Sequence, residues 1–160
     1  MAAALAVAAV LVVTGAVLAT PVPVVRLEGD DGKTVIRLEG PEFRYYYIHS
    51  VYRAPTTELL RVEGREIRLV SVFSDDRRVI ELLRWPGEPR REAHGYAQDA
   101  PDTPGTRMEE LRLLTGRGAR QRIVAGDREV QLATTFGDGA VRVRPAVASR
   151  AALLFERIGK

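Results

Sequence analysis

The residues best suited to chemistry lie in the stretch FRYYYIHSVYRAPTTE, residues 43–58, which holds five aromatic side chains, a histidine and one carboxylate. His49 is one of two histidines in the chain. An imidazole near a carboxylate can bind a ligand or transfer a proton, because burial and neighbouring charge set its pKa. A neutral histidine in the core, held by hydrogen bonds, is the other interpretation. The stretch is therefore either a recognition site or a structural clasp.

A β-hairpin is expected to position these residues. Alternation with a period of two places one set of side chains on a single face of the first strand: Phe43, Tyr45, Tyr47, His49 and Val51. Pro55 lacks an N–H and biases Ala54 away from the helical region, so the chain should turn there and return as a second strand from Thr57. Such a hairpin is predicted to bring the Glu58 carboxylate beside the His49 imidazole.

Residues 49–58, HSVYRAPTTE, resemble the signature of domain-of-unknown-function family 1850, whose members are small secreted proteins encoded beside TAXI-type TRAP transporter permeases. The family pattern is His-Ser-Val, an acidic residue, two variable positions, Pro, two further positions and Glu. The chain has Tyr52 at the acidic position and matches the pattern at His49, Ser50, Val51, Pro55 and Glu58. The resemblance implies an extracytoplasmic location, with a TRAP-type permease or its solute receptor as the partner. It implies no mechanism, because the family has no settled activity.

No complete catalytic motif occurs in the sequence. A hydrolase would need a nucleophile and a base, and Ser50 and His49 are the candidates close to Glu58. Adjacent strand residues point to opposite faces, so His49 is badly placed to activate Ser50. The chain also lacks a Gly-rich nucleophile elbow, a phosphate loop and a second histidine at metal-ligand spacing. We therefore expect a protein that is not an enzyme and that uses no cofactor or metal.

Two non-catalytic functions remain open at this stage. The first is an accessory or binding component of a TRAP-type solute transporter, which rests on the resemblance. The second is an independent small-solute-binding module, in which the face formed by Tyr45, Tyr47 and His49 holds the ligand and residues 86–105 cover it.

The first nineteen residues predict a signal peptide or a membrane anchor. Residues 2–19 carry no charge and are mostly Ala, Val and Leu. Val17, Leu18 and Ala19 suit the positions that a signal peptidase reads, and we favour cleavage after Ala19. The protein is then secreted or tethered to the outer face of the cytoplasmic membrane, and this segment is its one expected contact with the membrane.

Composition limits what residues 20–160 can be. Their number is typical of one domain that buries its own core. The absence of cysteine excludes disulfides and zinc sites built from thiolates. The formal net charge is +3, and Arg and Glu alternate along most segments rather than clustering. That spacing favours cross-strand ion pairs over a nucleic-acid-binding surface.

Alternating apolar residues and Gly-containing turns predict a mainly β fold, either an antiparallel sandwich or a partly open barrel. Strands are expected at residues 22–28, 34–39, 43–51, 57–63, 67–73 and 79–85, and a closing meander at residues 120–124, 130–134 and 140–144. The inward residues of the fifth strand should be Ile67, Leu69, Ser71 and Phe73. Residues 86–105, rich in Pro and Gly, predict a long loop. Residues 107–114 fit a strand or a helix, and the chain beyond Pro145 predicts a short amphipathic helix.

Overall fold

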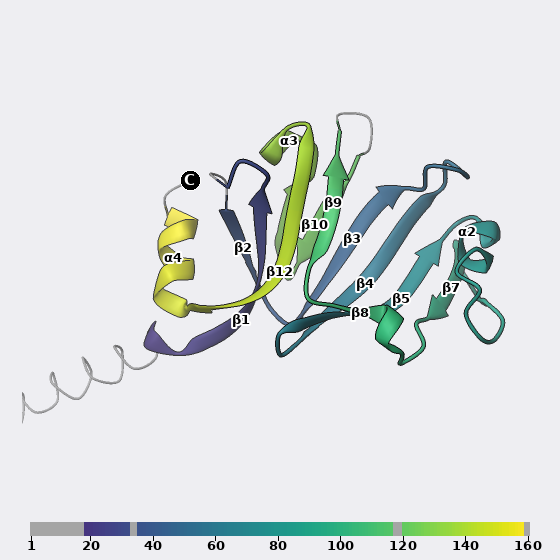
Figure 1. The fold of residues 1–160 in the computed structure, drawn as a ribbon, viewed down its shortest axis with the longest axis horizontal. Helices are drawn as coiled ribbons and strands as arrows, with labels where there is room; N and C mark the ends of the chain where they lie inside the picture. The colour runs from purple at the N-terminus through teal and green to yellow at the C-terminus, as the bar shows by residue number, and fades with distance from the viewer. Residues whose placement is uncertain (1–17, 33–34, 117–119, 159–160) are drawn as a thin grey trace, which may run out of the picture.

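The computed structural model describes residues 18–32, 35–116 and 120–158 (Figure 1). The predicted signal peptide or anchor, residues 1–19, lies almost wholly outside these ranges. Within them, no helix is both long and apolar enough to cross a membrane.

The described chain forms two antiparallel sheets. The smaller has the order β2 (Val35–Glu39), β1 (Pro21–Gly29), β12 (Gly139–Ser149) and β9 (Leu111–Thr115). The larger has the order β11 (Arg128–Gln131), β10 (Arg122–Ala125), β3 (Glu42–Ile48), β4 (Pro55–Glu63), β5 (Glu66–Ser74), β7 (Gly95–Asp99) and β6 (Arg90–Glu92), with β8 (Arg107–Met108) also paired to β5. The predicted mainly β, antiparallel fold is confirmed, and the sheets do not close into a barrel.

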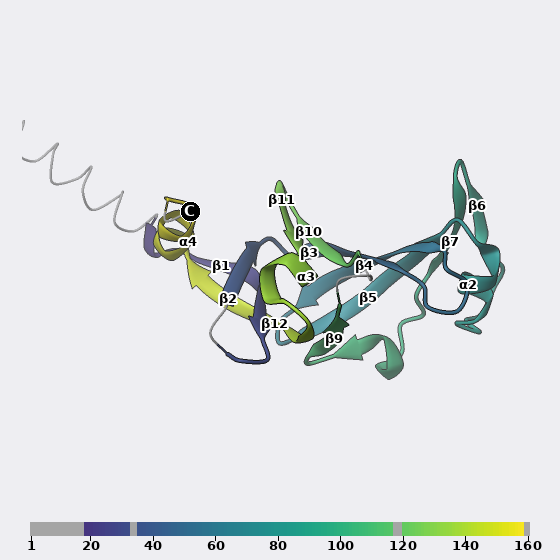
Figure 2. The same ribbon diagram turned by 90° about the horizontal axis from the view of Figure 1, so that it is seen from above.

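The main core lies where the two sheets face each other. Fully buried side chains from both sheets meet there, including Leu27, Leu38, Phe43, Leu60, Ile67, Ile123 and Val141. A second apolar cluster joins the start of β1 to the C-terminal helix α4 (Arg150–Ile158), through Val22, Val24, Ala148 and Leu153. Figures 1 and 2 show that the larger sheet continues past the smaller one toward β6, β7 and the short helix α2 (Arg77–Glu81).

A β-bulge changes the inward face of β5. The register between β4 and β5 shifts at residues 59–60, which leaves one extra residue in β5. Beyond the shift Val72 and Ser74 are buried, whereas Ser71 and Phe73 are only half-buried. The prediction of Ser71 and Phe73 as inward residues was therefore wrong, because one inserted residue reverses the alternation of the rest of the strand.

The predicted strand at residues 79–85 does not form, because residues 79–81 belong to helix α2 and residues 82–85 follow it without regular structure. Asp76 Oδ1 accepts a hydrogen bond from the backbone N of Arg78 at 2.9 Å and so caps the first turn of α2. Val79 and Ile80 are both buried, and two adjacent residues facing the interior fit a short helix better than a strand.

The predicted long loop at residues 86–105 is also wrong in part. It contains the β6–β7 hairpin, with His94 exposed in the turn, and the 3-10 helix η1 (Pro104–Thr106). The reason is local: β6 reads RRE and is exposed throughout, so it carries none of the alternation that predicts a strand.

The last third of the chain divides between the two sheets. Residues 107–114, which the sequence leaves ambiguous, contain strand β8 and most of strand β9, with Glu109 and Glu110 between them. Strands β10 and β11 form a hairpin in the larger sheet, helix α3 (Leu132–Phe136) follows, and β12 then pairs with β1 and β9 in the smaller sheet. The predicted closing meander was thus wrong in part: its first two strands form a hairpin, but residues 132–134 are helical and the third strand, β12, joins the other sheet. The predicted C-terminal helix is present as α4.

Candidate functional site

The register of the β3–β4 hairpin separates the residues of the predicted motif. Strand β3 ends at Ile48, which lies opposite Pro55, and Tyr45 lies opposite Glu58. His49 is thus four residues, or roughly 13 Å of extended chain, beyond the partner of Glu58. The predicted pairing of His49 with Glu58 was wrong, because only opposite and diagonal neighbours touch across two strands.

His49, Ser50, Val51 and Pro55 belong to the turn at the end of this hairpin, which we call the β3–β4 tip (residues 49–55). The backbone N of His49 donates to the Ala54 carbonyl at 2.8 Å, and the backbone N of Arg53 donates to the His49 carbonyl at 2.8 Å. The backbone N of Tyr52 donates to His49 Nδ1 at 3.3 Å. The imidazole therefore acts as an internal acceptor that orders the turn, at a half-buried position outside the core.

Helix α2 supports the tip from the side. The rings of His49 and Tyr52 stack with centroids 5.4 Å apart. The guanidinium of Arg78 lies over the Tyr52 ring, 4.8 Å from its centroid. Asp76 Oδ2, 2.6 Å from Arg78 Nη2, holds the guanidinium in place. This cation–π contact and ion pair limit the movement of the tip relative to the sheet.

The apex of the tip faces solvent. The side chain of Val51 is 70% exposed and Ser50 is exposed beside it. A shallow hollow of about 560 Å³ adjoins the tip, between Tyr52 and Arg53 on one side and Asp75 and Tyr96 on the other. The tip thus combines a fixed backbone with an apolar apex.

Glu58 belongs to a different group, which we call the tyrosine–glutamate cluster (Tyr45, Tyr47 and Glu58). The Tyr47 hydroxyl donates a hydrogen bond to Glu58 Oε1 at 2.9 Å. The rings of Tyr45 and Tyr47 stack with centroids 4.9 Å apart, and Gln121 Nε2 donates to the Tyr45 hydroxyl at 2.7 Å. The sequence predicted that Tyr45 and Tyr47 share a face, but it gave no sign that Tyr47, rather than His49, would bind Glu58.

Burial shifts the pKa of all three members of the cluster in the same direction. Burial raises the pKa of the Glu58 carboxyl above its usual value, and the hydrogen bond from Tyr47 opposes that shift. Burial, followed by the negative charge of Glu58, raises the pKa of both phenols, Tyr45 and Tyr47. The phenols therefore remain protonated and act as neutral neighbours of one carboxyl group.

The solute-binding face predicted from Tyr45, Tyr47 and His49 forms only in part. The structure brings the two tyrosines together, but the turn carries His49 into the tip. Residues 86–105 form an added hairpin beyond β5 instead of a cover, and Gln98 Nε2 donates to the carbonyls of Pro86 and Gly87 at 3.1 and 3.2 Å. These contacts hold the start of the segment against β7.

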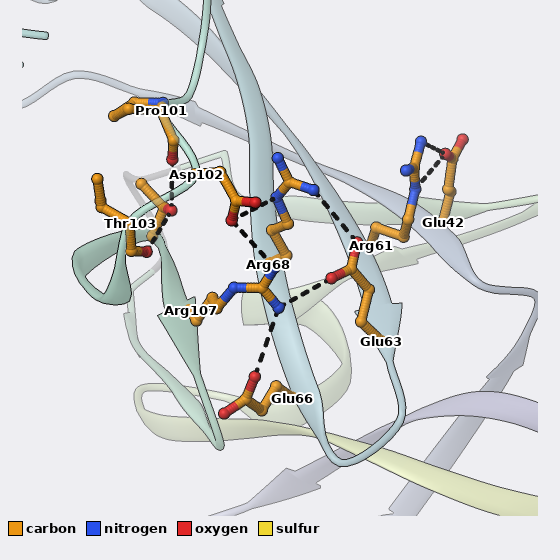
Figure 3. A network of polar contacts seen from close by, with 10 residues as sticks. Glu42, Arg61, Glu63, Glu66, Arg68, Pro101, Asp102, Thr103 and Arg107 are labelled. Atoms are coloured by element: carbon orange, nitrogen blue, oxygen red, sulfur yellow. Dashed lines mark hydrogen bonds and ion pairs between the residues drawn. The ribbon is translucent and has the colours of Figure 1, made fainter.

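A separate charge network joins β8 to the β4–β5 turn (Figure 3). Arg107 Nη1 lies 2.9 Å from Glu63 Oε2 and 3.6 Å from Glu66 Oε2, and Arg107 Nη2 lies 3.0 Å from Asp102 Oδ1. Arg68 Nη1 lies 3.5 Å from Glu63 Oε1. The hydrogen bond from Arg107 lowers the pKa of Asp102. The members satisfy one another's charges, so we interpret the network as a structural clasp.

The described residues contain no group of three or more His, Cys, Asp or Glu side chains able to hold a metal ion. Comparisons with protein-family models, curated proteins and solved structures found no match for this chain. The function must therefore be inferred from the geometry of the β3–β4 tip and the tyrosine–glutamate cluster, together with the resemblance in residues 49–58.

Proposed function

We propose that this protein is a non-catalytic, extracytoplasmic accessory component that docks onto a TRAP-type transporter permease, or onto its solute receptor, through the β3–β4 tip. The observation that carries the proposal is the exposed Val51 side chain at the apex of a turn fixed by three hydrogen bonds and a ring stack. An ordered tip binds a protein partner with little further loss of conformational freedom. Such an apolar apex can fill a pocket on the partner.

The resemblance supports the choice of partner. Four of the five residues that match the family signature lie in the tip: His49, Ser50, Val51 and Pro55. In the structure His49 orders the backbone of the turn, Pro55 begins the returning strand, and Ser50 and Val51 form the outer surface. The motif thus contains both the residues that build the tip and the residues that it presents.

The proposal predicts that Val51→Asp weakens partner binding without unfolding the protein. A charge at the apex should weaken binding by at least about tenfold, because it would be desolvated in the partner's pocket. The free energy of unfolding should change by less than about 0.5 kcal/mol, since the side chain is exposed. Affinity for the purified permease and receptor is measured by surface plasmon resonance, and stability by urea unfolding.

Leu114→Asp is the matched control, because Leu114 is 80% exposed and lies on β9 in the other sheet. It should bind as the wild type does. Equal binding by the wild type and both variants would contradict docking through the tip.

A second candidate is small-solute binding at the tyrosine–glutamate cluster. The observation that favours it is the half-buried Glu58 carboxylate, which forms no ion pair with any residue that the structure describes and lies beside two aromatic rings. That chemistry suits a small organic cation. Binding of a quaternary ammonium probe that is lost in Glu58→Gln and kept in Val51→Asp would favour this function over the first.

A further inference from the structure

A cavity opens where the two sheets separate at the β4–β5 turn. Strand β9 pairs with β12 only as far as Leu111 opposite Val143, whereas β12 continues along β1 to Ser149. The exposed flank of residues 144–147 forms one wall of a cavity of about 490 Å³. Gly64 and Arg65 of the turn form another wall, and Glu109 and Glu110, between β8 and β9, complete it. A volume of this size is typical of small-molecule sites.

The cavity contains two kinds of charged side chain. Glu110 is neutralised, because Arg112 Nε donates to it at 2.5 Å and Arg144 forms a further ion pair with it. Arg65 and Glu109 differ: across residues 18–32, 35–116 and 120–158, neither forms a hydrogen bond or an ion pair. The cavity therefore offers one guanidinium and one carboxylate without protein partners.

The wall formed by β12 is apolar. Pro145, Ala146 and Val147 line it, and Val147 is 70% exposed although Val143 and Ala148 of the same strand are buried. An exposed valine on a strand within a cavity is a surface that a bound apolar group would cover.

We propose that this cavity binds a small zwitterion with an apolar side chain, that is, a free aliphatic α-amino acid. The ligand carboxylate would pair with Arg65, its ammonium group with Glu109, and its side chain would cover Val147. A ligand with a single charge would leave one of the two protein charges unmatched. The site lies at the opposite end of β4 from the β3–β4 tip, about 30 Å away along a nine-residue strand, so it is independent of the proposed docking surface.

The test is isothermal titration calorimetry of the full chain with leucine, leucinamide and N-acetylleucine. Leucine should bind, and each analogue should bind at least about tenfold more weakly, because each lacks one of the two charges. Arg65→Gln should weaken leucine binding and remove the preference over leucinamide. Glu109→Gln should weaken it and remove the preference over N-acetylleucine.

Arg91→Gln is the control, because Arg91 is an exposed arginine of β6, remote from the cavity, whose side chain has no polar partner among the described residues. It should leave leucine binding unchanged. No heat of binding with leucine at millimolar concentration would overturn the proposal, as would wild-type affinity in both Arg65→Gln and Glu109→Gln. Urea unfolding of each variant checks that the fold is intact. The free energy of unfolding should change little, because the Arg65 and Glu109 side chains are exposed.

Discussion

Replacement of Phe43 with alanine is expected to lower the free energy of unfolding by about 3–5 kcal/mol. Phe43 is only 1% exposed and is among the largest fully buried side chains. It lies on β3 opposite Leu60 and packs in the core shared by the two sheets. The substitution removes buried apolar surface from the core and leaves a cavity. The flanking strands cannot move to fill that cavity, because backbone hydrogen bonds hold both of them in the sheet.

Phe155→Ala is the matched control, because it makes the same chemical change at a side chain that is 75% exposed on α4. Its effect on the free energy of unfolding should stay within about 0.5 kcal/mol. Urea unfolding followed by circular dichroism compares the two variants. A cost for Phe43→Ala no larger than that for Phe155→Ala would show that the sheets do not pack through Phe43.

The parts of the fold that sequence predicts are those with uninterrupted alternation and a short turn. Strand β2 and the first part of β3 are of this kind, and Ile36, Leu38, Phe43 and Tyr45 are buried as expected. The predicted face does not continue to Val51, whose side chain is 70% exposed in the turn. The failures have a common physical basis, since each depends on contacts that local periodicity does not contain. The bulge in β5 adds a residue, the Asp76 cap starts a helix, and β6 is stabilised by pairing with β7 despite its charged sequence.

The sequence directs attention to residues 43–58 but assigns Glu58 the wrong partner. The residue types alone singled out residues 43–58, and Tyr45 and Tyr47 do share a face. The partner of Glu58 depends on the register, and the register depends on the number of residues in the turn. The tip uses residues 49–54 for the reversal, which places Glu58 opposite Tyr45 and within reach of Tyr47. A sequence with no tight-turn signature at this position does not specify that number.

Glu58 is expected to make the protein less stable as pH rises. Its pKa in the folded state lies above the value of 4.5 for an unperturbed glutamate, because burial disfavours the charged carboxylate. The folded state therefore keeps this proton at pH values where the unfolded chain has lost it. The resulting stabilisation is complete below about pH 4.5 and is lost as pH rises through the folded-state pKa. Each unit of difference in pKa corresponds to about 1.4 kcal/mol.

Two substitutions should change this pH dependence in opposite directions. Glu58→Gln retains an oxygen acceptor for the Tyr47 hydroxyl but removes the charge, so the free energy of unfolding should rise at pH 7 and fall less steeply between pH 4 and pH 8. Tyr47→Phe removes the hydrogen bond to the carboxylate, so it should cost about 1–3 kcal/mol where Glu58 is charged and less where it is protonated. Glu42→Gln, at an exposed carboxylate of the same hairpin, should keep the wild-type slope because Glu58 remains. Urea unfolding across this pH range measures all four proteins, and parallel curves for wild type and Glu58→Gln would show that the Glu58 carboxyl does not resist ionisation in the folded state.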